Sequence, residues 1–126
     1  MKRIIYKDCN NNTIFLKDLF IQIQSFSNVE LSWNISNLDL IPIDKGDYVN
    51  GIPSFEMEKL FNFQKRVLDE DTVSISHTAF MNLLENIRTI YEGKFITAIE
   101  DKQIKMKVFD GDIIEIDGVV EDKIIT

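Results

Sequence analysis

Residues Gln103–Ile116, QIKMKVFDGDIIEI, predict two strands joined by a tight turn. Apolar and polar side chains alternate over Gln103–Val108, which is the period of a strand with one buried face. Asp110-Gly111 is a short-range hairpin signal, because both residues tolerate the left-handed backbone that such turns require. The apolar run Ile113–Ile116 then forms the returning strand, so this region predicts an antiparallel pair.

Further strands are predicted on both sides of this hairpin. Val29–Ile35 alternates clearly, but the apolar parity shifts after it, so Ser36-Asn37 marks a tight turn or a bulge. Pro42 is expected to close the second segment or to lie on a sheet edge. The remaining predicted strands are Lys2–Lys7, Phe95–Glu100 and, after a turn at Asp117-Gly118, Val119–Ile125.

Three segments have the spacing of amphipathic helices. The first begins at Thr13, placed to cap it, and reaches Phe26, although Phe20–Gln24 also fits a strand. The second is Phe55–Val67, which Ser54 is placed to cap. Between the strand that Pro42 closes and this helix, Asp44–Pro53 is expected to be the longest loop.

The third helix is predicted to begin after Ser76 and to reach Tyr91, because apolar residues recur there at helical spacing. Gly93 stands just beyond, where a left-handed cap is commonly needed. These elements predict an α+β fold, with two or three helices packed on one mainly antiparallel sheet. At 126 residues and 14.7 kDa, residues 1–126 are expected to form a single domain.

The residues that usually perform catalysis or bind metals are scarce. Cys9 and His77 are the single cysteine and the single histidine, too few for a zinc site or a nucleophilic triad. His77 is interpreted as a surface or capping-region histidine, Cys9 as a loop thiol and Trp33 as a core residue. No glycine-rich phosphate loop occurs. We therefore predict no catalytic residue, metal or cofactor, although 21 acidic residues leave a carboxylate-based enzyme open.

The negative charge is concentrated in the second half of the chain. Residues 1–68 hold eight basic and eight acidic side chains, whereas residues 69–126 hold six and thirteen, which gives the net charge of −7. This balance argues against nucleic-acid binding and favours a basic protein partner. A merely solvated face is the plain alternative. The candidate partner-binding residues are Asp69, Glu70, Asp71, Asp110, Asp112, Glu115 and Asp117.

The sequence also predicts a cytoplasmic protein without a membrane segment. The longest apolar runs are far too short to cross a bilayer, and no signal-peptide stretch follows the first residues. A lone Cys9 excludes an intrachain disulfide.

Two stretches, Ser74–Leu84 continuing to Ile90–Phe95, and Val108–Ile116, give the chain a resemblance of type to small acidic bacterial immunity proteins. The resemblance implies a non-enzymatic inhibitor that binds and neutralises a cognate toxin. In that group, carboxylates often cover a basic nuclease site, whereas the neutral first half here also allows binding beside the active site. The alternative is a small-ligand or regulatory domain with a pocket between the Phe80–Tyr91 helix and the sheet. Neither hypothesis predicts the oligomeric state.

Overall fold

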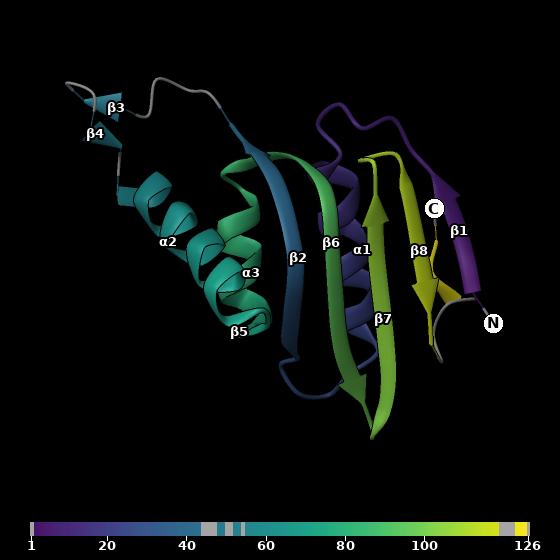
Figure 1. Ribbon diagram of the computed structural model, residues 1–126. Helices are drawn as coiled ribbons and strands as arrows, with labels where there is room; N and C mark the ends of the chain where they lie inside the picture. Colours follow the sequence, from purple (N-terminus) through teal and green to yellow (C-terminus); the bar gives the residue numbers. More distant parts are fainter. Residues whose placement is uncertain (1, 44–47, 50–51, 54, 119–122, 126) are drawn as a thin grey trace.

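Three helices pack on one face of a six-stranded antiparallel sheet, which confirms the predicted α+β fold (Figure 1). The computed structural model describes residues 2–43, 48–49, 52–53, 55–118 and 123–125. The strands of the main sheet are β1 Lys2–Tyr6, β2 Ser32–Pro42, β5 Val73–Ser76, β6 Ile87–Ile99, β7 Lys102–Phe109 and β8 Ile113–Asp117. Their order is β1-β8-β7-β6-β2-β5, so β1 and β5 form the two edges.

The β7–β8 hairpin forms as predicted. Phe109 pairs with Ile113, and the turn between them has φ of 54° at Asp110 and 77° at Gly111. Both angles lie in the left-handed region that Asp and Gly tolerate. The hairpin then continues to β1, because Tyr6 pairs with Ile113 on the other side of β8.

Helix α1, Thr13–Ser25, confirms the predicted helix and excludes the strand alternative for Phe20–Gln24. Thr13 is not its cap. Asn12 occupies the N-cap position, whereas the buried Thr13 hydroxyl donates to the carbonyl of Ile87 at 2.6 Å. Helix α2, Phe55–Glu70, is longer than predicted, and the cap expected from Ser54 lies outside the described residues.

The prediction of the third helix is correct for its first turns and wrong for the rest. Ser76 does cap α3, accepting from the Ala79 N–H at 3.3 Å, but this helix is only His77–Leu84, and the 13-residue strand β6 begins at Ile87. Ile87 and Tyr91 are four residues apart, a spacing that places them on one face of a helix and also on one face of a strand. β-Branched residues are frequent in β6 and favour the strand.

Gly93 therefore lies inside β6 and is not a helix cap. A Cβ at this position would meet the ring of Phe95 at 2.5 Å. On the paired strand β2, the first of three register shifts lies between Ser36 and Asp39, and Asn37 has φ of 54°. This confirms the bulge that the change of parity predicted, and β2 ends at Pro42 as expected.

Two other predictions fall partly on residues that the structure does not describe. In the predicted loop Asp44–Pro53, the strands β3 Tyr48–Val49 and β4 Ile52–Pro53 pair with each other. In the predicted strand Val119–Ile125, residues 119–122 are outside the described residues, and 123–125 are not in the sheet. The carbonyl of Ile124 instead accepts from Arg3 Nη1 at 2.6 Å.

Aromatic rings fill the centre of the core. Phe20 of α1 is in edge-to-face contact with Trp33, Phe80 and Phe95, at centroid distances of 4.9, 5.2 and 5.1 Å. Trp33 is fully buried, as predicted. These rings occupy the space between α3 and the sheet, where the sequence had suggested a ligand pocket.

A buried amide connects the start of α1 to the sheet. Asn12 Nδ2 donates to the carbonyls of Ile90 and Gly111, both at 2.8 Å, and its Oδ1 accepts from the Ile90 N–H at 2.9 Å. Asn12 is 2% exposed. One side chain thus satisfies three buried backbone groups from β6 and the β7–β8 turn.

Candidate functional site

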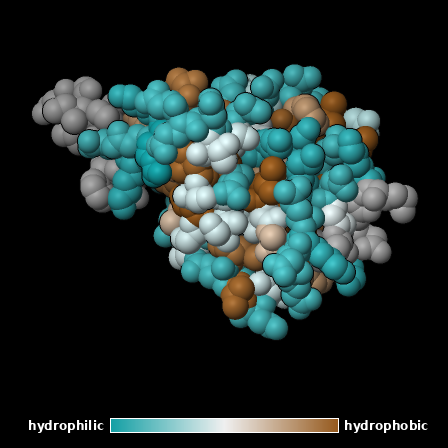
Figure 2. Space-filling model, turned by 60° about the horizontal axis from the view of Figure 1, so that its bottom comes forward, coloured by the Kyte–Doolittle hydropathy of each residue, from teal (hydrophilic) through white to brown (hydrophobic). Residues whose placement is uncertain are grey.

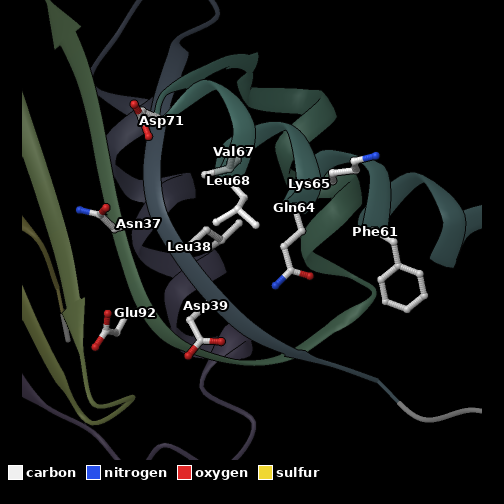
Figure 3. Close-up of a pocket in the computed structure, with 10 residues that line it drawn as sticks. All are labelled: Asn37, Leu38, Asp39, Phe61, Gln64, Lys65, Val67, Leu68, Asp71 and Glu92. Carbon is white, nitrogen blue, oxygen red and sulfur yellow. The ribbon is translucent and has the colours of Figure 1, made fainter.

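A groove of about 590 Å³ runs between α2 and the middle of β2 (Figure 3). The bulge in β2 and one side of α2 form its two walls. On the α2 side, Phe61, Gln64, Lys65 and Leu68 follow the i, i+3, i+4, i+7 spacing of one helix face. The other lining residues are Asn37, Leu38, Asp39, Val67, Asp71 and Glu92.

The floor of the groove is apolar. Leu38 is half-buried and Val67 is buried, and both pack in or against the core. Leu68 extends beside them and is 80% exposed (Figure 3). An exposed leucine next to a partly covered apolar floor provides the contact that a partner side chain can bury.

The opposite rim of the groove is acidic. Asp39 and Glu92 are directly opposed residues of β2 and β6, and both are exposed. Like charges in directly opposed positions of a sheet are destabilising. Asp71 supplies a third carboxylate, and Figure 3 shows the Lys65 amine pointing away from all three. The rim can therefore interact favourably with cationic groups.

Asp71 reaches the groove because the chain turns sharply after α2. Its φ is 64°, and the Thr72 N–H donates to the carbonyl of Glu70 at 2.7 Å. Asp69 and Glu70 belong to the last turn of α2, so of this acidic run only Asp71 lies in the turn after the helix. Glu70 pairs with Arg66 at 3.1 Å.

The acidic residues predicted from the sequence do not form one surface. Asp71 precedes β5, whereas Asp110, Asp112, Glu115 and Asp117 belong to β8 and the turn before it. The strands β5 and β8 lie four strand spacings apart, which is about 19 Å. Only Asp71 of the predicted set lines the groove.

The second acidic group is itself divided. Asp110 and Asp112 are exposed in the β7–β8 turn, where the Asp112 carbonyl accepts from the Lys7 N–H at 2.8 Å. Glu115 and Asp117 lie on the face of the sheet away from the helices, and Glu115 pairs with Lys2 at 3.3 Å. Lysines therefore offset part of the negative charge on that face.

Sequence reasoning missed Asp39 and Glu92. They are far apart in the chain, and no local motif connects them. The change of parity at Ser36-Asn37 located the bulge beside Asp39, but the pairing with Glu92 depends on which strand lies next to β2. The sequence prediction also put Glu92 just after a helix ending at Tyr91, whereas this segment belongs to the strand β6.

His77 lies in the capping region of α3, which was one of its two predicted positions, and not on the surface. It begins α3 but is buried, and its Nδ1 accepts from Trp33 Nε1 at 3.2 Å. Burial lowers the pKa of His77, and the nearby Glu30 carboxylate offsets this only in part. The neutral imidazole is thus the form that the Trp33 hydrogen bond requires. Within the described ranges, no group of three or more His, Cys, Asp or Glu side chains is placed to hold a metal ion.

Comparison with known proteins gives no match: no family model fits the chain, and no curated protein or solved structure is significantly similar to it. In the described part of the chain, no helix has both the length and the apolar character needed to cross a membrane. Figure 2 shows one side of the surface as mainly hydrophilic, with hydrophobic residues exposed in several small areas.

Proposed function

We propose that this protein is a non-enzymatic binding module that neutralises a cognate bacterial toxin, and that it grips a basic segment of the toxin in the groove between α2 and β2. The main observation behind this proposal is that Asp39 and Glu92 are directly opposed beside the apolar floor of the groove. A cation beside both carboxylates would interact favourably with each of them.

The groove has the components of a protein-binding site. An apolar anchor such as Leu or Met can contact Leu38 and Leu68, while Lys or Arg side chains meet the rim carboxylates. Buried apolar anchors supply most of the affinity of such interfaces, whereas complementary charges raise the association rate. The net charge of −7 adds long-range attraction for a basic partner.

Two features support the immunity role. They are the resemblance in type to small acidic bacterial immunity proteins and the groove with its acidic rim. The inhibitor acts in the cytoplasm, where it must meet the toxin before the toxin reaches its target. Because the acidic groove residues come from three separate parts of the chain, we favour attachment beside the toxin's active site over mimicry of a continuous phosphate chain.

The experiment uses the genes that flank this protein's own gene. Each product is expressed in a host cell alone and together with this chain, and growth is recorded. We expect one basic product to stop growth and co-expression of this chain to restore it, with a stoichiometric complex after purification. If none of the toxic flanking products is relieved by this chain, the immunity proposal is wrong.

A small-ligand function is the second candidate, because the volume of about 590 Å³ lies within the range of small-molecule sites. The acidic rim would select a cationic metabolite. A thermal-shift screen of polyamines and other organic cations separates the two, since a ligand that binds only the folded protein raises the melting temperature increasingly with its concentration relative to its Kd. A ligand whose effect disappears in the Asp39→Asn, Glu92→Gln variant would favour this candidate.

A further inference from the structure

The open face of the sheet, away from the helices, has two halves of different chemistry. On β2 and β5 it presents only small polar side chains, namely Ser32, Asn34, Ser36, Ser74 and Ser76. On β1 and β7, in contrast, Ile4, Tyr6 and Phe109 are 52%, 75% and 40% exposed. A solvated sheet face is normally polar throughout. The half formed by β1, β8, β7 and β6 is therefore the one suited to being covered.

Charge on β7 and β8 is arranged in two adjacent rows, flanked by Lys94 of β6, which is opposed to Lys107, and by Lys2 of β1, which pairs with Glu115 at 3.3 Å. Lys105 and Lys107 of β7 lie beside Asp117 and Glu115 of β8, in register. The pairing is Lys105 with Asp117 and Lys107 with Glu115, so the basic row and the acidic row have equal spacing. If a second copy faces this surface, the basic row of each copy can lie over the acidic row of the other.

A two-fold axis parallel to the strands, above the boundary between β7 and β8, makes this complementarity explicit. It places β7 of one copy over β8 of the other and β6 over β1. Lys107 then faces the second copy's Glu115, and Lys105 faces its Asp117, with both contacts repeated by symmetry. The four strands that the axis exchanges are β1, β8, β7 and β6, and the polar strands β2 and β5 stay outside.

We propose that a second copy of this chain binds face to face on the β1-β8-β7-β6 half of the sheet. The interface is small, about 19 Å wide, so the dimer is weak and its population depends on concentration. Its apolar contacts come from Ile4, Tyr6 and Phe109. Of the groove residues, Glu92 alone belongs to a strand of this half, and α2 and β2 lie outside the interface.

Sedimentation velocity from low micromolar to submillimolar concentration tests the proposal with two charge-reversal variants. Lys105→Glu with Lys107→Glu makes both rows acidic, and Glu115→Lys with Asp117→Lys makes both basic. We expect the wild type to shift from monomer to dimer with concentration, each variant to stay monomeric, and an equimolar mixture of the variants to form dimers again. Circular dichroism checks that each variant is folded.

Tyr6→Asp provides a second test that does not alter the charge rows. Tyr6 is 75% exposed, so the fold should tolerate the change while dimerisation is lost. A wild type that stays monomeric throughout, a Tyr6→Asp protein that dimerises like the wild type, or a mixture of folded charge variants that stays monomeric would each overturn the proposal.

Discussion

Asp39 and Glu92 are directly opposed residues of β2 and β6, and both line the groove beside α2. The bulge at Asn37 and Leu38 brings this pair next to the turn that holds Asp71. Like charges in directly opposed sheet positions are expected to lower the stability of the folded protein. Residues that oppose folding in this way are characteristic of binding sites.

Neutralising this pair should stabilise the fold. In Asp39→Asn with Glu92→Gln the repulsion is lost, and we expect the free energy of unfolding to rise by about 0.2–1 kcal/mol. Urea denaturation at low salt measures the change. The matched control is Asp110→Asn with Asp112→Asn, which removes two charges from the exposed β7–β8 turn and should alter stability by less than about 0.5 kcal/mol. A groove variant less stable than the wild type would show that the pair is stabilising.

Leu68 should matter for binding and not for folding. Because it is 80% exposed, Leu68→Asp should change stability by less than about 0.5 kcal/mol. Affinity for the partner should fall by about 2 kcal/mol, the usual cost of removing an apolar anchor. Ile14→Asp on α1, which is 78% exposed and distant from the groove lining, is the matched control and should bind normally. Equal losses in both variants would point to net charge rather than the groove.

Asn12 should be among the most sensitive polar positions. Asn12→Ala leaves one buried N–H and two buried carbonyls without their partner, which we expect to cost about 2–4 kcal/mol of unfolding free energy. The exposed neighbour Asn10 serves as the control, since its side chain makes none of these contacts. Chemical denaturation compares the two, and a small effect at Asn12 would mean that water replaces the amide.

The single histidine should make stability fall on acidification. The pKa of His77 is lowered by burial, so the unfolded chain binds a proton near the ordinary value of 6.5 while the folded protein does not. Unfolding is therefore favoured as the pH falls below that value, and the loss is complete at the folded pKa. Hydrogen bonds from Thr78 lower the pKa of Glu30, but its contribution changes only below its ordinary 4.5.

Melting temperatures measured from pH 7 to about pH 5 test this expectation. His77→Asn keeps an acceptor near the position of Nδ1 and cannot titrate, so its melting temperature should vary less over this range. If the variant and the wild type fall in parallel, other groups are responsible for the pH dependence.

The sequence predicted the fold wherever the signal was local. The Asp110-Gly111 turn, the helix from Thr13 and the bulge at Ser36-Asn37 each follow from the chemistry of adjacent residues. Ile87–Tyr91 fitted two periods at once, and pairing with β2 selects the strand.

The sequence predicted one acidic surface, but the structure distributes its residues over separate parts of the sheet. Counting charges identified an acidic second half, but its residues are distributed by strand order, which separates Asp71 from Asp110 by most of the sheet's width. Asp39 belongs to the neutral first half and was not considered. Its pairing with Glu92 is a long-range contact that neither local sequence encodes.

The most direct test of the groove as the toxin-binding site is the affinity of the toxin identified by co-expression. Calorimetry compares the wild type, Asp39→Asn with Glu92→Gln, and Asp110→Asn with Asp112→Asn, each at low and high salt. We predict at least about a tenfold loss for the groove variant, near wild-type affinity for the turn variant, and weaker binding of the wild type at high salt. Unchanged affinity in the groove variant with a loss in the turn variant would contradict the account and place the interface at the β7–β8 turn.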